Sequence, residues 1–188
     1  QLLRQDGRIA NVHLLFVGSG ELGGQLRTAC DVVHDAENVG VAPAAPRSSR
    51  PLASFAGFMN QTEISRAYVA ADCLVLASDH GETWGLVVNE ALASGLPCVV
   101  SSACGCAEDM VPPTEETRTY PTGNVEKLAS VLQSVHKGPR LPGNAGDILS
   151  HHDFRVTVDT VSRLYLSTQP PPGWRSSSGV SGISQARS

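Results

Sequence analysis

The chain of 188 residues carries 14 lysine and arginine residues against 18 aspartate and glutamate residues, which gives a formal net charge of −4. With 41% hydrophobic and 17% charged residues it has the composition of one folded globular domain, which excludes a solvated disordered chain. Its lysines are Lys127 and Lys137 alone, so it has no basic stripe for duplex DNA or RNA and we expect no nucleic-acid partner.

The first residues, 2–7, have the pattern of the end of an amphipathic helix rather than of a signal peptide, so we expect a fragment or a truncated product. No run of about 18 apolar residues occurs, and we therefore expect no transmembrane segment. Five cysteines, an odd number, lie mostly in apolar runs, as Cys73 and Cys98 do, and match no disulfide framework. The simpler interpretation is a reducing setting, so we expect a cytoplasmic protein.

Short apolar runs alternate with helical stretches along the chain. We predict strands at residues 12–17, 53–58, 73–76 and 97–100, a weaker strand at 118–120, and helices at 21–34, 60–71, 85–94, 124–136 and 147–166. Strands that are apolar on both faces belong in parallel sheets covered by helices. The order therefore predicts an α/β fold with a Rossmann-like doubly wound parallel sheet, whose ligands bind at the carboxyl ends of the strands. The loops at those ends are 18–20, 57–61, 77–85 and 101–106.

Two stretches interrupt this alternation. Pro43, Pro46 and Pro51 mark a surface loop, and from Ser167 onward a run rich in proline, serine and glycine has no apolar period. We expect one domain over residues 1–166 and a disordered tail over 167–188. The helix predicted from residue 60 has a capping-box-like start, because Asn60 stands three residues ahead of Glu63.

The most informative segment contains Glu82 and Glu90 with seven residues between them. Between them a helix begins near Gly85, and the free N–H groups and dipole at its N-terminus favour binding of an anion. Because glycine has no Cβ, an anion can approach the backbone at Gly85 closely. A helical rise of ~1.5 Å per residue puts the carboxylates about 10 Å apart, one on each side of the anion site. A nucleoside diphosphate sugar has that layout of hydroxyls, diphosphate and ribose diol. A bare pair of glutamates would more simply be surface charge, but here a strand, a glycine loop and a small-residue helix surround it.

The run from Glu82 to Pro97, ETWGLVVNEALASGLP, resembles the E-x7-E signature of retaining glycosyltransferases of family 4, the glycosyl transferases group 1 domain. The resemblance extends over roughly residues 12–166 in the order of that family, through Gly57-Phe58, Ala71-Asp72, residues 76–78, residues 99–101, and Gly105 with Glu108. It implies that this chain is the C-terminal, donor-binding half of a two-domain GT-B fold, a nucleotide-sugar-binding domain over residues 1–166.

The resemblance also implies roles for individual residues. Glu82 would be the catalytic-site group that contacts the donor sugar near its reacting carbon, and Glu90 would hold the ribose diol. The other donor-binding positions are the backbone of Thr83, Trp84, Gly85 and Leu86 at the diphosphate, Gly57 and Phe58 beside the base, and Gly18 and Gly20 on the phosphate side of the cleft. Transfer in this family resembles a front-face displacement that retains configuration, and it needs no cofactor and no metal.

Departures from the family pattern limit the expected activity. The family's basic pair for the diphosphate, and its acceptor-binding N-terminal domain, would both lie upstream of Gln1. We therefore expect this chain to bind a nucleotide sugar weakly and not to transfer the sugar. We expect the missing N-terminal acceptor domain to be its partner, and any peripheral membrane association to occur through that domain. Ala77 stands where a proline is usual, and Cys106 where a second glycine is common, which would narrow the loop beside the sugar pocket. The alternative is a non-catalytic nucleotide-binding or interaction module derived from the same fold.

Other patterns favour simpler interpretations. Residues 18–23 spell G-x-G-x-x-G after a strand, but the acidic residue expected about 20 positions on is absent from 38–41, which disfavours a dinucleotide site. Cys104 and Cys106 lack a second ligand pair for a metal. His80 is interpreted as a loop residue at the surface, and the first-turn Trp84 as more often a core residue than a stacking platform. Phe16, Phe55 and Phe58 are assigned to the core. An epimerase or phosphorylase on the same fold fits the glutamate context less well.

Overall fold

The computed structural model describes residues 2–5, 9, 11–38, 50–110, 118–137, 150 and 154–168. The predicted surface loop, apart from Arg50 and Pro51, and the predicted tail beyond Thr168 lie outside the described residues. The chain divides into two compact units, Gln1–Ser150 and His151–Ser188, so the last predicted helix groups with the end of the chain rather than with the sheets.

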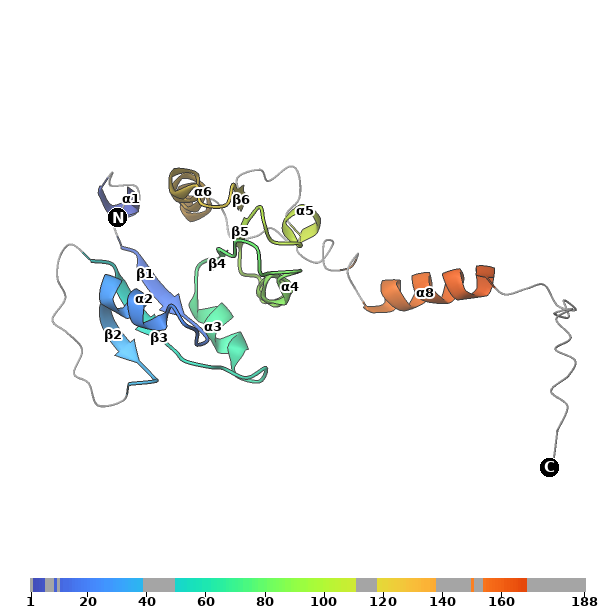
Figure 1. Ribbon diagram of the computed structural model, residues 1–188, viewed down its shortest axis with the longest axis horizontal. Helices are drawn as coiled ribbons and strands as arrows, with labels where there is room; N and C mark the ends of the chain where they lie inside the picture. The colour runs from blue at the N-terminus through green and yellow to red at the C-terminus, as the bar shows by residue number, and fades with distance from the viewer. Residues whose placement is uncertain are drawn as a thin grey trace, which may run out of the picture. The chain divides into compact units, whose positions relative to one another are not determined.

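The first sheet of the larger unit contains three parallel strands in the order β1-β3-β2 (Figure 1). They are β1 (His13–Phe16), β2 (Asp31–Asp35) and β3 (Leu52–Phe55); α1 (Leu2–Gln5) precedes them and α2 (Gly23–Ala29) joins β1 to β2. In register, Phe16 pairs with Phe55. Cys30, Ala53 and Phe55 form its small buried core, against which Leu26 of α2 packs. The packing of α2 on this core and the pairing of β1 with β3 therefore place the loop after β1 next to the end of β3.

The helix predicted over residues 21–34 is wrong in its second half. It ends at Ala29, and the chain continues as β2, which pairs in parallel with β3 from Asp31 to Asp35. Val32 and Val33 are β-branched residues, which fit a pleated surface better than a helix. Because β3 lies between β1 and β2, the pairing that decided this segment joins residues about twenty positions apart, beyond the reach of local periodicity.

The second sheet is also parallel and three-stranded, in the order β4-β5-β6. Its strands are β4 (Leu74–Leu76), β5 (Cys98–Ser101) and β6 (Thr119–Tyr120), and its helices are α3 (Ile64–Ala70), α4 (Leu86–Ala93), α5 (Ala107–Met110) and α6 (Val125–Lys137). Every residue of β5 is buried. Cys98 and Val100 belong to the core formed with α4, whereas Val99 belongs to the core formed with Val131 of α6. Since successive side chains of a strand point to opposite faces, helices cover both faces of this sheet.

This arrangement confirms the predicted α/β class with parallel sheets. The strands predicted near residues 74, 98 and 119 and the helices near 86 and 125 are present within one or two residues of their expected bounds. Among the described residues, β1 and β4 each have a strand on one side only, so the structure contains two sheets rather than one continuous sheet.

Two smaller expectations end differently. The predicted capping-box start at residue 60 is wrong, because α3 begins at Ile64 with Glu63 as its N-cap and no side-chain cap. In the turn before α3, the Asn60 side chain accepts hydrogen bonds from Thr62, and Glu63 accepts one from the Asn60 N–H at 3.5 Å. In the smaller unit, α8 spans Phe154–Thr168, two residues into the segment expected as tail. Among the helices that the structure describes, none has the length and apolar content that crossing a bilayer requires.

Candidate functional site

Gly85 is the turning point between β4 and α4. It is the N-cap of α4 and has φ 99° and ψ 57°. L residues adopt this left-handed conformation at a cost, whereas glycine, which has no Cβ, adopts it readily. A methyl group at Gly85 would lie 2.8 Å from Leu76 Cδ2 and 3.1 Å from Cys106 Sγ. The helix N-terminus therefore rests directly on the end of β4 and on the loop that follows β5.

The loop after β5 is fitted against the backbone of the glutamate segment. The Cys106 N–H donates to the Trp84 carbonyl at 2.9 Å, and a methyl group at Gly105 would overlap the Thr83 carbonyl oxygen. The Cys106 side chain is fully buried, and burial raises the pKa of its thiol to about 11, so it is a neutral packing group at pH 7. No cluster of metal-ligating side chains occurs in the part of the chain that the structure describes.

The Glu82 carboxylate forms a hydrogen bond within its own loop. Its Oε1 accepts a hydrogen bond from the Trp84 backbone N–H at 3.3 Å, so one of the donors expected to meet a diphosphate already binds a carboxylate. The Trp84 indole is half-buried against the larger core and donates from Nε1 to Asn89 Oδ1 at 3.1 Å. An anion at the start of α4 would compete with Glu82 for the same N–H, and Glu82 would then be released to accept from hydroxyl groups.

Glu90 has a partner that the sequence did not reveal. Its side chain leaves α4 toward solvent, and its Oε2 accepts a hydrogen bond from the Tyr68 hydroxyl at 2.8 Å. Tyr68 is 6% exposed and belongs to the core between α3 and α4. Burial, and next the Glu90 carboxylate, raise the pKa of Tyr68, so its hydroxyl stays a donor at neutral pH. The only sequence signal for this contact was a tyrosine on the core-facing side of α3, whose polar tip needs a partner.

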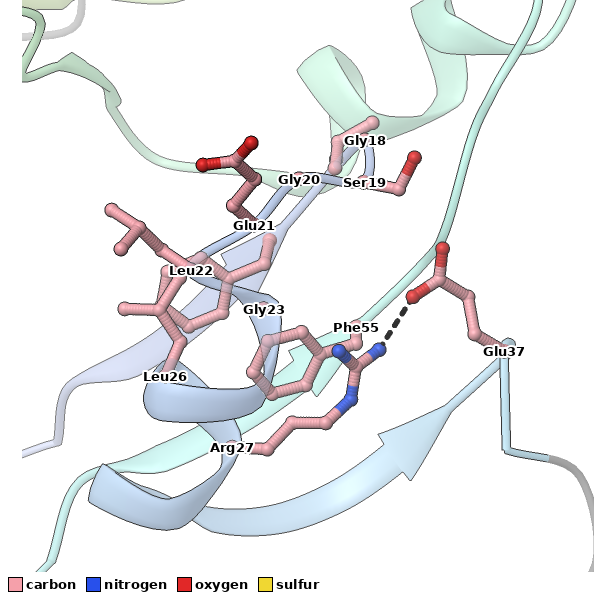
Figure 2. A pocket seen from close by; sticks show the side chains of 12 residues that line it. Gly18, Ser19, Gly20, Glu21, Leu22, Gly23, Leu26, Arg27, Glu37 and Phe55 are labelled. Carbon is pink, nitrogen blue, oxygen red and sulfur yellow. Dashed lines mark hydrogen bonds and ion pairs between the residues drawn. The ribbon is translucent and has the colours of Figure 1, made fainter.

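The glycine loop after β1 borders a pocket of about 370 Å³ (Figure 2). Gly18 and Gly20 line it, and the Gly18 N–H donates to the Gly57 carbonyl at 2.8 Å, which joins the ends of β1 and β3. Phe55 lines the pocket and stacks on Phe16 with ring centroids 4.7 Å apart. The core assignment of Phe58 is wrong, because its side chain is 80% exposed.

An arginine with two acidic partners forms one side of this pocket. Arg27 binds Asp35 at 2.6 Å. It also binds Glu37 at 2.6 Å, and its guanidinium lies 4.4 Å from the centre of the Phe55 ring (Figure 2). The expectation that no acidic residue closes the second strand is therefore wrong, because Asp35 ends β2 and Glu37 follows it. However, β3 separates β1 from β2, and Arg27 already occupies both carboxylates, so the geometry still disfavours a dinucleotide site.

The Arg27 contacts predict an acid-sensitive stability. Hydrogen bonding from Arg27 holds the pKa of Asp35 well below its usual 3.8. A lowered folded-state pKa contributes stability above the usual value, and this contribution is lost as pH falls through the folded value. We expect the thermal midpoint to fall on acidification from about pH 5 to about pH 2 more steeply in the native chain than in Arg27→Gln. Thermal unfolding over this pH range measures the change in the midpoint. Arg66→Gln, which replaces an exposed arginine, is the control. Equal dependence of the midpoint on pH in all three chains would contradict the stabilising role of the contact between Arg27 and Asp35.

The predicted site residues thus form two groups at the carboxyl ends of parallel strands, where the sequence placed them. Glu82, Thr83, Trp84, Gly85, Leu86 and Glu90 surround the start of α4 after β4, and Gly18, Gly20 and Gly57 gather after β1 and β3. The pocket of Figure 2 is lined from the second group and by no residue of the first. The role of each residue in ligand binding stays a prediction.

A family model described as glycosyl transferases group 1 matches residues 1–137. The chain is 38% identical over 86 residues to sulfoquinovosyl transferase SQD2 of Arabidopsis thaliana, covering 44% of this chain and 16% of that protein. It is 37% identical over 103 residues to a GDP-mannose-dependent alpha-mannosyltransferase of Mycobacterium tuberculosis, covering 54% of this chain and 27% of that protein. The chain therefore spans less than a third of the length of these two curated relatives.

Two solved structures are similar to this fold. Sucrose-phosphate synthase from Thermosynechococcus elongatus superposes with a TM-score of 0.52 at 26% identity, covering 61% of this chain and 30% of that one. HepE of Anabaena, in complex with UDP-glucose, superposes with a TM-score of 0.54 at 21% identity, covering 89% of this chain and 52% of that one. The second likeness shows the fold alone. Both likenesses agree with the Rossmann-like α/β class expected from the sequence.

Proposed function

The chain belongs to the glycosyl transferases group 1 family, and we propose that it binds the nucleotide diphosphate sugar donor of a retaining glycosyltransferase of family 4, as the C-terminal half of a GT-B enzyme. The observation that carries this proposal is the start of α4, where Glu82 and Glu90 flank a left-handed backbone at Gly85 that favours glycine. The UDP-glucose seated in the HepE structure and the transferase relatives support the same ligand class.

In the proposed complex the diphosphate binds the backbone from Thr83 to Leu86. The diphosphate replaces Glu82 as the acceptor of the hydrogen bond from the Trp84 N–H. The Glu82 carboxylate then accepts from the donor sugar hydroxyls and stabilises positive charge near the reacting carbon. Glu90, held from one side by Tyr68, accepts from the ribose diol. In the transfer step the bond from the sugar carbon to the diphosphate breaks on the same face on which the bond to the acceptor oxygen forms. The acceptor proton passes to the leaving diphosphate, so the proposal needs neither a metal nor a cofactor.

The acceptor-binding domain and the basic pair for the diphosphate belong, in this proposal, to the length of the relatives that this chain does not span. We further propose a cytoplasmic setting, in keeping with five free cysteines, with peripheral membrane contact through the acceptor domain.

Calorimetric titration with UDP, GDP, ADP and their sugar conjugates tests the donor site. Glu90→Ala removes a charged acceptor from the ribose, which every nucleotide shares, so we expect all of them to lose about 1–3 kcal/mol together. Glu126→Ala removes an exposed glutamate from the first turn of α6 and serves as the matched control. Equal binding by Glu90→Ala and the native chain would contradict the ribose assignment.

The same mixtures test the need for an acceptor domain. We expect the chain to bind a donor sugar and to transfer none of it to added sugar or lipid acceptors, because the surface that would orient the acceptor hydroxyl belongs to the other half of the fold. Release of nucleoside diphosphate, followed by chromatography, measures transfer. Turnover by this chain alone would show that the acceptor site lies within it.

A further inference from the structure

Within the described residues, the Tyr68 hydroxyl donates the side-chain hydrogen bond that links the proposed ribose-binding carboxylate to the protein core. We propose that Tyr68 is a positioning residue, which orients Glu90 for the 2′- and 3′-hydroxyls of a ribonucleotide and so sets the preference of the site for a ribose diol. This inference rests on the proposed function, because it assumes that Glu90 meets the ribose.

The tyrosine ring is fixed where it stands. Tyr68 lies on α3 and is buried in the core cluster that includes Val88 and Leu92, which lie on either side of Glu90 along α4. A ring packed between two helices has little freedom to change rotamer. Its hydroxyl therefore presents a donor at a constant position, 2.8 Å from Glu90 Oε2.

Glu90 depends on that donor because little else restrains it. The carboxylate is exposed, and within the described residues it has no ion pair. A glutamate side chain free to rotate loses conformational entropy when it is fixed by a ligand, and a pre-formed hydrogen bond reduces that loss. Tyr68 restricts the orientations of Glu90 before any nucleotide arrives.

The hydrogen bond also leaves the acceptor capacity that a diol needs. An ionised carboxylate has about four lone-pair sites on its two oxygens. Tyr68 uses one site on Oε2, so Oε1 and the remaining site on Oε2 stay available for two hydroxyl donors. Burial, together with the Glu90 carboxylate, raises the pKa of Tyr68, so its hydroxyl remains a donor to that carboxylate at neutral pH.

The experiment compares nucleotides with and without the diol. Calorimetry measures the binding of UDP, GDP and ADP and of their 2′,3′-dideoxy forms to the native chain, to Tyr68→Phe, to Glu90→Gln and to the double variant. We expect Tyr68→Phe to reduce the preference for the ribo form about threefold to tenfold, with the dideoxy forms bound as by the native chain. In the Glu90→Gln background, Tyr68→Phe should change the preference no further.

Tyr120→Phe is the matched control, because Tyr120 is a buried tyrosine, 5% exposed, in the separate core beside α6. A native preference for the ribo form that Glu90→Gln removes and Tyr68→Phe retains would overturn the role of Tyr68 and leave the proposed function standing. Equal weakening of ribo and dideoxy forms by Tyr68→Phe would assign it a purely structural role and overturn the inference. Failure of the native chain to bind any nucleotide would overturn both proposals.

Discussion

Gly105→Ala is expected to lower the free energy of unfolding by about 3 kcal/mol, near the upper end of what overpacking costs. The added methyl group would overlap the Thr83 carbonyl oxygen, which is backbone and cannot swing away as the end of a side chain does. Relief requires the loop after β5 to move from the glutamate segment, and this movement breaks the hydrogen bond from the Cys106 N–H to the Trp84 carbonyl. Nucleotide binding should be lost with it, since Thr83 and Trp84 form the proposed diphosphate contact.

Gly81→Ala provides the control for this substitution. Gly81 lies in the same glutamate segment, is exposed, and a methyl group there would meet nothing within 4 Å. We expect its denaturant midpoint to stay near that of the native chain, within the roughly 0.5 kcal/mol usual for surface changes. Urea unfolding of both variants gives the comparison. A Gly105→Ala chain as stable as Gly81→Ala would mean that the loop after β5 is not fitted against Thr83.

Strand β5 of the second sheet was predictable because burial on both faces requires successive apolar residues. A strand such as β5, covered by α4 and α6, must be apolar at successive positions, and Cys98-Val99-Val100 is such a run. Gly95, whose φ is 73°, and Pro97 follow the end of α4 and disfavour its continuation as a helix. Here local pattern and long-range packing require the same residues.

Strand β2 was not predictable for the opposite reason. Its pattern of Asp31, two valines, His34 and Asp35 is mixed, and only pairing with β3 and the contacts of Arg27 decide its structure. Phe58 was misassigned in a similar way. Aromatic residues next to a strand are usually buried, but β3 ends at Phe55 and the chain has left the core three residues later.

For the candidate site, sequence supplied the residues and the structure supplied their partners. The E-x7-E spacing located Glu82, Gly85 and Glu90 around one helix start, because spacing along a helix is a local property. The bonds from the Tyr68 hydroxyl to Glu90 and from the Arg27 guanidinium to Asp35 depend on side-chain direction and on how separate elements pack. Neither property can be read from spacing, so the residue that orients Glu90 became visible only in three dimensions.

Gly85→Ala is expected to destabilise the chain by about 2–3 kcal/mol, by two effects that a second glycine separates. The left-handed backbone at φ 99° costs an alanine roughly 1 kcal/mol, and the methyl group would stand 2.8 Å from Leu76 Cδ2 and 3.1 Å from Cys106 Sγ. Gly95 also has a positive φ, 73°, but a methyl group there meets nothing within 4 Å, so Gly95→Ala should show the backbone cost alone.

The difference between these two variants in urea unfolding therefore measures how closely β4, the loop after β5 and the start of α4 are packed. A difference of about 1–2 kcal/mol is expected from overpacking. Equal destabilisation would mean that Leu76 and Cys106 yield freely, and that glycine is required at Gly85 for its backbone conformation only. In that case the protein could accommodate a side chain at residue 85, and Gly85→Ala would still bind nucleotide. If Gly85→Ala is instead the more destabilised variant, the start of α4 must shift, and the proposed diphosphate contacts shift with it.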